Sequence, residues 1–239
     1  MSESNNLYVG IPLYDGLTLM DFVGASEVFA MTNGFKVEWL GATMDTITTS
    51  ENLHVVPNRT FDEASEKIDI LFIPGGYYPG VEAAMFSSVY QGFLKKAIPN
   101  ATWVGSVCTG AFVLAAAGGL TDCTATTYWS QLPNLSLLNE KYNITVAAGY
   151  PRFVIDEKRK RFSGGGISSS LDLALELLKR IKGKDIAEQT QLNIQYAPAP
   201  PVHAGDPSQA PAAITEQVLI NEADFVGGMY NAVKKLIGS

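Results

Sequence analysis

The chain has 239 residues and a formal net charge of -7, which predicts one α/β domain over residues 1–239 and argues against nucleic acid and anionic membranes as partners. No apolar run approaches the about 20 residues that cross a bilayer. The polar N-terminus and the presence of only two cysteines, Cys108 and Cys123, predict a reduced protein located in the cytoplasm.

Short runs rich in β-branched and aromatic residues alternate with helical runs in the first half of the chain. We predict strands over residues 7–14, 35–40, 68–74 and 102–107, with a short β-pair around 52–57. We predict helices over residues 19–31, 81–98 and 109–117. This alternation predicts a mostly parallel sheet with helices on both faces, an α/β three-layer sandwich whose ligands bind at the carboxyl edge of the strands.

The second half of the chain has a looser pattern. We predict helices over residues 129–142, 168–182, 184–196 and 214–237, and strands over 145–155 and 161–163. The basic run 158–161 follows two acidic residues and predicts a solvated hairpin turn. The prolines of residues 197–201 end a helix because they lack N–H donors, and residues 202–211 are expected to form a loop.

Cys108 lies where a β-rich run changes into a helical run rich in Ala and Leu, a pattern typical of a nucleophile elbow. At such a turn the side chain faces the unpaired N–H groups of a helix, whose partial positive charge favours a thiolate. We therefore expect a lowered thiol pKa and a nucleophilic role. The alternative is a core cysteine, because free cysteines are among the most buried residues.

Three further features fall at the same predicted edge of the sheet. Gly75 and Gly76 end a strand, where their N–H groups could approach a ligand as an oxyanion hole, or form only a turn. Asp21 could be a partly buried acid beside the thiol, with a raised pKa. Its spacing from Thr18 equally fits a helix cap. Thr109 could position a substrate, or simply begin the helix.

Other chemistries have little support in the sequence. A cysteine–histidine hydrolase requires an imidazole near the thiol, and His54 and His203 are both far from Cys108 along the chain. The cysteines and histidines do not have metal-ligand spacing, and no G-x-G-x-x-G motif follows the first strand. The sequence therefore predicts a cysteine site without metal or cofactor.

Several of these motifs resemble those of the ThiJ/PfpI superfamily, which has a flavodoxin-like sheet and an elbow cysteine. They are the sequence SVCTG at 106–110, IPGG at 73–76 and the early acid Asp21. The sequences ATTYW at 125–129, GGGI at 164–167 and QYAPAPP at 195–201 make the chain similar to the isonitrile hydratase branch. The similarity covers nearly the whole chain and implies a single ThiJ/PfpI-like (class I glutamine amidotransferase-like) domain.

The resemblance implies a homodimer and a cofactor-independent lyase. Such an enzyme adds water to a small-molecule isonitrile and releases an N-substituted formamide. Cys108 is then the nucleophile that forms a thioimidate, and Asp21 is the acid and base. Thr109 becomes a positioning group, and the Gly76 N–H a backbone donor.

Three aromatic or aliphatic positions bear on the substrate pocket. Trp129 and Ile167 are candidate pocket walls, although packing alone explains either residue. Tyr128 stands where members of the isonitrile hydratase branch have histidine, which leaves the substrate preference open. Proteases and deglycases of the superfamily commonly have histidine directly after the cysteine, and Thr109 at that position argues against those activities.

Two other functions fit the same residues. An exposed thiol of low pKa oxidises readily, so Cys108 could serve a redox sensor or a ligand-sensing module. Regulators that carry such domains need an added helix-turn-helix domain, and residues after 211 predict only one long helix. The third possibility is a noncatalytic protein that keeps the fold.

Overall fold

A computed structural model of the chain describes residues 6–238. Residues 1–5, part of the polar N-terminus on which the expected cytoplasmic location rests, lie outside the described residues, as does residue 239. Among residues 6–238, every helix is too short or too polar to span a lipid bilayer.

The centre of the molecule is a seven-stranded sheet with the strand order β10-β11-β7-β6-β1-β2-β5. All neighbouring strands are parallel except β10 and β11, which form an antiparallel hairpin. The strand bounds are β1 (Leu7–Pro12), β2 (Phe35–Gly41), β5 (Arg59–Thr60), β6 (Ile70–Ile73), β7 (Trp103–Val107), β10 (Phe153–Asp156) and β11 (Arg161–Gly164). The hairpin turn predicted at residues 158–161 joins β10 to β11.

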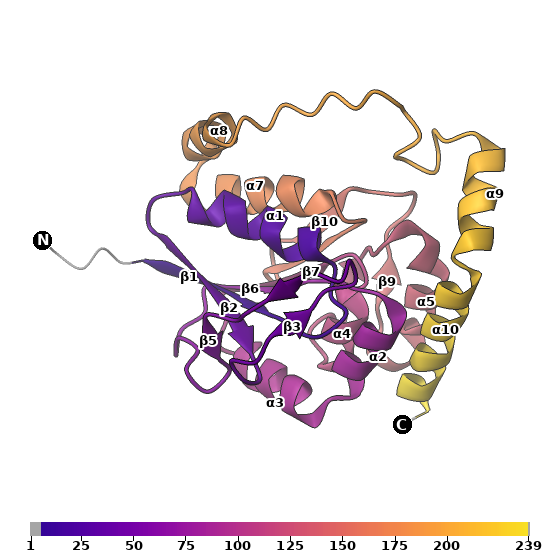
Figure 1. Cartoon of the computed structure of the whole chain (residues 1–239), viewed down its shortest axis with the longest axis horizontal. Helices are drawn as coiled ribbons and strands as arrows, with labels where there is room; N and C mark the ends of the chain where they lie inside the picture. The colour runs from indigo at the N-terminus through magenta and orange to yellow at the C-terminus, as the bar shows by residue number, and fades with distance from the viewer. Residues whose placement is uncertain (1–5, 239) are drawn as a thin grey trace, which may run out of the picture.

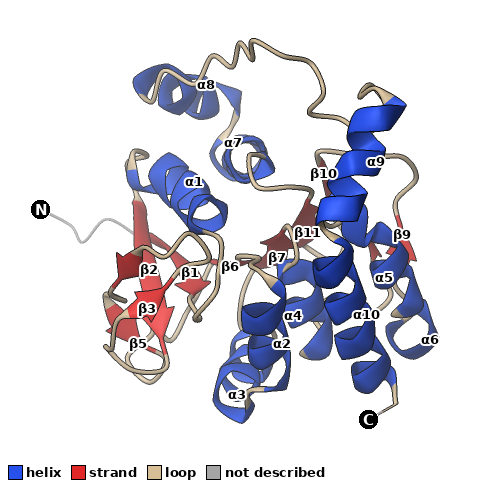
Figure 2. Cartoon of the chain, turned by 45° about the vertical axis from the view of Figure 1, so that its right-hand side comes forward, coloured by secondary structure: helices blue, strands red, loops and turns tan. Residues whose placement is uncertain are grey.

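Helices cover both faces of this sheet (Figure 2). One layer contains α1 (Leu19–Ala30), α7 (Ser169–Lys182) and α8 (Lys184–Asn193), and α7 packs on both other helices. The opposite layer contains α2 (Tyr78–Phe86), α3 (Ser88–Ala97), α4 (Gly110–Ala116) and α10 (Ala223–Ile237). The predicted α/β sandwich with a mostly parallel sheet is therefore confirmed.

The central strands are buried because helices cover both of their faces. All four residues of β6 and all five of β7 are buried, which is why these strands read as nearly continuous apolar runs in the sequence. The carboxyl ends of β6 and β7 lead directly into residues 74–76 and 108–109. The core thus fixes where these two loops meet.

Three predicted helices are interrupted in the structure, so these predictions are wrong in detail. The span 81–98 divides at Ser87, whose side chain accepts a hydrogen bond from the Tyr90 N–H (3.2 Å) and caps α3. The span 129–142 divides into η1 (Trp129–Gln131), α5 (Leu132–Leu137) and α6 (Asn139–Tyr142), with Pro133 in the first turn of α5. The span 214–237 divides at Glu222 into α9 (Ala212–Asn221) and α10.

The predicted strand 145–155 is also interrupted. Its ends form β9 (Thr145–Val146) and β10, and β9 pairs with β8 (Thr124–Ala125) in a separate two-stranded sheet. Gly149 between them has a φ of 74°, a conformation that ends an extended run. The short pair expected around 52–57 consists of β4 (His54–Val55) and its upstream partner β3 (Ile47–Thr48).

The segment between α8 and α9 forms the expected loop. It runs as an extended arch along the top of Figure 1 and leads into α9, which lies at the right of the view. No residue of α9 is buried. The arch and α9 are therefore peripheral additions to the sandwich, and both reach the cavity described below.

Candidate functional site

The backbone of Cys108 is held in a left-handed turn between β7 and α4. Its φ is 54°, which is uncommon for a residue with a side chain. The Cys108 N–H donates to the carbonyls of Gly164 (3.1 Å) and Gly165 (2.8 Å), and its carbonyl accepts from the Thr127 hydroxyl (2.7 Å). These three hydrogen bonds offset the backbone strain and fix the position of the thiol.

Asp21 is a wholly buried acid in the first turn of α1. Its Oδ2 accepts a hydrogen bond from the Gly75 N–H (2.9 Å), and Oδ1 has no partner within the described residues. The helix-cap alternative is not supported, because the Thr18 side chain makes no capping bond and its hydroxyl lies 3.3 Å from that of Ser50. Asp21 is therefore a buried acid with one free oxygen.

Gly75 brings the acid, the cysteine and the threonine together. A Cβ atom at this position would lie 2.8 Å from Asp21 Oδ2, 2.8 Å from Cys108 Cβ and 2.6 Å from the Thr109 nitrogen. All three groups thus surround Gly75, which has no side chain. α1 and the loop after β7 can approach this closely because residue 75 is a glycine.

Burial controls the protonation of both reactive groups. It raises the pKa of Asp21 from an ordinary 3.8 to about 8, although the Gly75 hydrogen bond opposes the shift. Burial also raises the pKa of the Cys108 thiol, and the neighbouring Asp21 raises it further. The predicted lowering of the thiol pKa is therefore wrong. The reason is that α4, the helix that follows, has only seven residues, whereas Cys108 is only 6% exposed, so burial outweighs the effect of the helix.

The expected pair of open backbone donors is not present in this arrangement. The Gly75 N–H donates to Asp21, and the Gly76 N–H donates to the Thr109 hydroxyl (2.9 Å). The same hydroxyl donates back to the Gly76 carbonyl (2.8 Å). Thr109 is thus a wholly buried clamp on the Gly76 peptide, and both glycine N–H groups are occupied by the protein.

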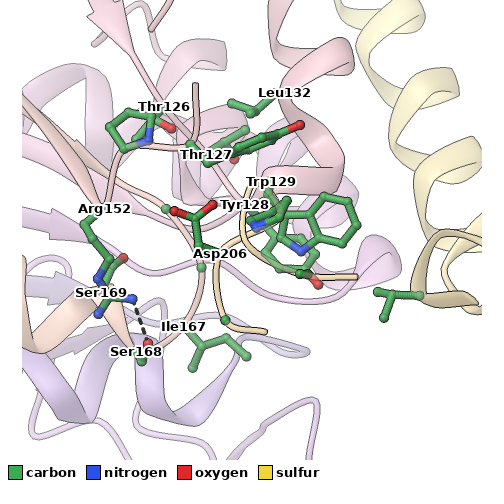
Figure 3. Close-up of a pocket in the computed structure, with 18 of the residues that line it drawn as sticks. Thr126, Thr127, Tyr128, Trp129, Leu132, Arg152, Ile167, Ser168, Ser169 and Asp206 are labelled. Atoms are coloured by element: carbon green, nitrogen blue, oxygen red, sulfur yellow. Dashed lines mark hydrogen bonds between the residues drawn. The ribbon is translucent and has the colours of Figure 1, made fainter. Parts of the chain in front are cut away.

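A cavity of about 440 Å³ lies beside this cluster (Figure 3). Trp129 and Ile167, the two predicted pocket walls, both line it, together with apolar residues from the arch and α9. Figure 3 shows a polar side opposite Trp129, where Arg152 donates to the Ser168 hydroxyl (3.0 Å). A cavity of this size is in the range of small-molecule sites.

The cavity and Cys108 are adjacent, but Cys108 is not among the residues that line it. Thr127 and Gly165 connect the two, because each lines the cavity and each forms a hydrogen bond with the Cys108 backbone. The sequence reasoning missed these two roles. Thr127 lies within the ATTYW motif at 125–129, so the motif identified the segment although not the contact.

The histidines do not contribute to the buried cluster. His54 and His203 are both exposed, one in β4 and one in the arch. Besides burial, the groups that shift the pKa of the Cys108 thiol are Asp21, which raises it, and Thr109, which lowers it. Within residues 6–238, no three His, Cys, Asp or Glu side chains are arranged to hold a metal ion.

Gly75→Ala is expected to disrupt the cluster. The added methyl group would clash with the Thr109 nitrogen and with Cys108 Cβ, neither of which is the end of a flexible side chain. We expect a loss of about 1–3 kcal/mol in the free energy of unfolding, measured by urea denaturation.

Gly92→Ala in α3 is the matched control. A Cβ there would have open space around it, so the free energy of unfolding should rise by about 0.5–1 kcal/mol, because alanine favours a helix interior. Equal stability of the Gly75→Ala variant and the unmodified chain would contradict the close approach at Gly75.

Comparison with known proteins gives three findings. A sequence profile of the DJ-1/PfpI family matches residues 8–180. An isonitrile hydratase from Pseudomonas putida is 33% identical over 214 residues, which cover 88% of each chain. The crystal structure of a ThiJ/PfpI family protein from Pseudomonas syringae superposes with a TM-score of 0.88 at 29% identity, covering 95% of this chain and 90% of the other.

Some relatives are regulators. The HTH-type transcriptional regulator GbdR from Pseudomonas aeruginosa is 26% identical over 185 residues, which cover 75% of this chain and 48% of the regulator. The similarity to it is weaker than that to the isonitrile hydratase and covers a smaller share of both proteins. The profile match and the relative at 33% identity show that this chain belongs to the DJ-1/PfpI family, as its motifs predict.

Proposed function

We propose that this protein is a cofactor-independent lyase that hydrates isonitriles to N-substituted formamides. The observation that carries the proposal is the buried Asp21 carboxyl beside the Cys108 thiol, with a pKa of about 8. An acid with this pKa is mostly protonated at neutral pH and can donate a proton. The terminal carbon of an isonitrile accepts both a nucleophile and a proton, which matches a thiol next to an acid.

The first step is addition of the thiol to the isonitrile. Asp21 donates its proton to the terminal carbon of R–N≡C while Cys108 Sγ forms a bond to the same carbon. The thiol proton passes to the carboxylate, so that Asp21 is protonated again. The product is the thioimidate R–N=CH–S–Cys108, and no charged species persists in a site that disfavours charge.

The second step is hydrolysis of the thioimidate. Water adds to the carbon and its proton reaches the substrate nitrogen, with Asp21 as the shuttle. The resulting R–NH–CH(OH)–S–Cys108 collapses, the C–S bond breaks, and the hydroxyl proton returns to sulfur. The formamide R–NH–CHO leaves, and both groups regain their initial protonation.

The cavity supports a bulky, mostly apolar R group. Trp129, Leu132, Ile167 and Val218 line it from different elements, and it is large enough for an aryl or cycloalkyl group. The isonitrile group is linear and only two atoms long. It can therefore reach the thiol of Cys108, a residue that is 6% exposed, while the R group stays in the cavity.

A sensor role has one observation in its favour, the similarity to the regulator GbdR. Against redox sensing stands the raised pKa of the buried Cys108 thiol, because oxidation requires an accessible thiolate. Hydration therefore fits the site better than oxidation. The homodimer and the cytoplasmic location stay predictions from the sequence and its resemblance.

The test of this function is product formation. Purified protein is incubated with methyl, cyclohexyl and 4-nitrophenyl isonitriles, and formamide is followed by mass spectrometry. We expect formamide from all three substrates, with the lowest KM for the two bulky ones, and ¹⁸O incorporated from labelled water. Trapping with borohydride should leave an adduct on the Cys108 peptide. No formamide from any substrate would contradict the proposal.

A further inference from the structure

A short hydrogen bond joins the wall of the cavity to the point where α9 meets α10. The Tyr128 hydroxyl donates to Glu222 Oε1 at 2.6 Å, across 94 positions of the sequence. Glu222 is the only residue between the two helices. The bond therefore lies at the joint from which α9 extends over the cavity.

The joint matters because the two helices differ in how they are held. α10 buries Phe225, Met229 and Val233 against the body, and its Val226 carbonyl accepts from Asn134 (3.0 Å). α9 buries no residue. Within the described part of the chain, the hydrogen bonds of residues 197–221 all have partners inside residues 191–222.

α9 and the arch nevertheless form one side of the cavity. Ile214, Thr215 and Val218 of α9 line it, as do residues 204–207 and 210 of the arch. A helix of 10 residues is marginal in isolation. Its place over the cavity therefore depends on its attachment at Glu222.

Tyr128 is itself fixed from the side of the cysteine. Its ring packs over Gly166, where a Cβ atom would lie 3.2 Å from the ring. Thr127 binds the Cys108 carbonyl and Gly165 binds the Cys108 N–H. The immediate neighbours of Tyr128 and Gly166 in the chain thus hold the cysteine, and Tyr128 links that rigid turn to the joint.

The Glu222 carboxylate depends on the Tyr128 hydroxyl as its hydrogen-bond donor. Burial and the nearby Glu222 carboxylate raise the pKa of Tyr128, which keeps its hydroxyl a donor. Glu222 Oε2 is buried and has no hydrogen-bond partner among the described residues. Without the Tyr128 hydroxyl, the carboxylate would have no donor while its Oε2 stays buried, which is costly unless the joint moves outward into water.

We propose that Tyr128 and Glu222 are a positioning pair that keeps α9 over the cavity and so determines how tightly the site holds a bulky substrate. Tyr128 is not a catalytic residue here, because it acts through the joint. This role deepens the proposed hydratase function, on which its kinetic consequence rests. The structural consequence, closure of α9, does not depend on which reaction the site performs.

The experiment uses Tyr128→Phe, which removes the hydroxyl and keeps the ring on Gly166. Glu222→Gln keeps an acceptor and removes the charge, so it should retain the closed joint. Glu222→Ala removes the bond from the other side and serves if Tyr128→Phe does not fold. Tyr230→Phe, an exposed tyrosine on α10, is the matched control.

The first readout is hydrogen–deuterium exchange of the backbone amides of residues 213–222. We expect exchange roughly tenfold faster in Tyr128→Phe and Glu222→Ala, in line with loss of a hydrogen bond to a charged group. Glu222→Gln should change the rate by less than about threefold, and Tyr230→Phe should not change it. Unchanged exchange in both Tyr128→Phe and Glu222→Ala would overturn the proposal.

The second readout separates positioning from general loss of structure. With 4-nitrophenyl isonitrile, Tyr128→Phe should raise KM roughly tenfold and leave kcat within about twofold, because only binding of the bulky group is weakened. With methyl isonitrile both constants should stay near the values of the unmodified protein. An equal fall in kcat for both substrates would overturn the proposal. If the unmodified protein hydrates neither isonitrile, the hydratase function fails, and the exchange readout alone decides the role of the pair.

Discussion

Replacing Cys108 with serine is expected to lower kcat for isonitrile hydration by roughly 10⁴-fold or more, because the hydroxyl is a far weaker nucleophile than the thiol. Serine has nearly the same size and places the same strain on the turn at φ 54°. The three hydrogen bonds to the Cys108 backbone should therefore persist. Formamide production by this variant is measured by mass spectrometry after confirming its fold by circular dichroism.

Cys123→Ser provides the control for this variant. Cys123 is the other buried cysteine, and its Sγ donates to the Thr121 carbonyl (3.4 Å), a bond that serine can also make. The kcat of the Cys123→Ser variant should stay within about twofold of that of the unmodified protein. Retained turnover in Cys108→Ser would contradict covalent catalysis by the thiol.

Replacing Asp21 with asparagine is expected to lower kcat by about 10²–10⁴-fold, the usual contribution of a positioned acid and base. The amide keeps the size of the side chain and an oxygen for the Gly75 N–H, but it cannot pass a proton. Asp69→Asn is the control, because Asp69 is also buried and accepts from the Tyr8 N–H (2.9 Å) at the other end of the sheet. In the unmodified protein, kcat/KM should fall as pH rises through about 8, where Asp21 loses its proton.

The same substitution tests the raised pKa without any substrate. The pKa of Asp21 is about 8 in the folded protein and near 3.8 when unfolded, so between these values the folded state holds a proton that the unfolded state has released. Stability must therefore fall as pH rises through this window, by about 1.4 kcal/mol per pH unit relative to Asp21→Asn. Below pH 3.8 the stabilities of the unmodified protein and of Asp21→Asn should change with pH in the same way.

Urea denaturation at about pH 5, 6 and 7 measures this difference, and the thiol stays protonated in both states over that range. The asparagine variant should gain stability relative to the unmodified protein at each step. Parallel pH profiles for the two proteins would show that the carboxyl is ionised in the fold, and the acid role in the first step would then fail.

Much of the fold follows from patterns in the chain itself. Most strands and helices as far as residue 117 were predictable because buried parallel strands are apolar throughout and their helices follow directly. The edge strand β5 was missed because its two residues are polar and not buried. The interruptions were not predictable to the same degree. At Ser87 a local cap competes with a continuing apolar pattern, and at Glu222 the break coincides with a contact to Tyr128, which is distant in the sequence.

The candidate site was also only partly predictable from the sequence. The motifs around Cys108, Gly75 and Asp21 identified the residues that meet at the carboxyl edge. The state of these residues could not be inferred, since a strand-to-helix turn predicts a lowered thiol pKa, whereas burial raises it. Likewise, the glycine N–H groups were predicted as open donors but are bonded to Asp21 and Thr109.

Patterns in the chain alone predict the strand–helix alternation of the first half, the position of the cysteine at the end of β7, and membership of the DJ-1/PfpI family. These depend on local periodicity and on short motifs, both of which involve residues that are close together in the sequence. How deeply the thiol and Asp21 are buried, and which helix lies over the cavity, become apparent only in the folded chain. Burial and contacts such as Tyr128–Glu222 arise between segments far apart in the chain, and the energy of a charge or hydrogen bond depends on that surrounding protein.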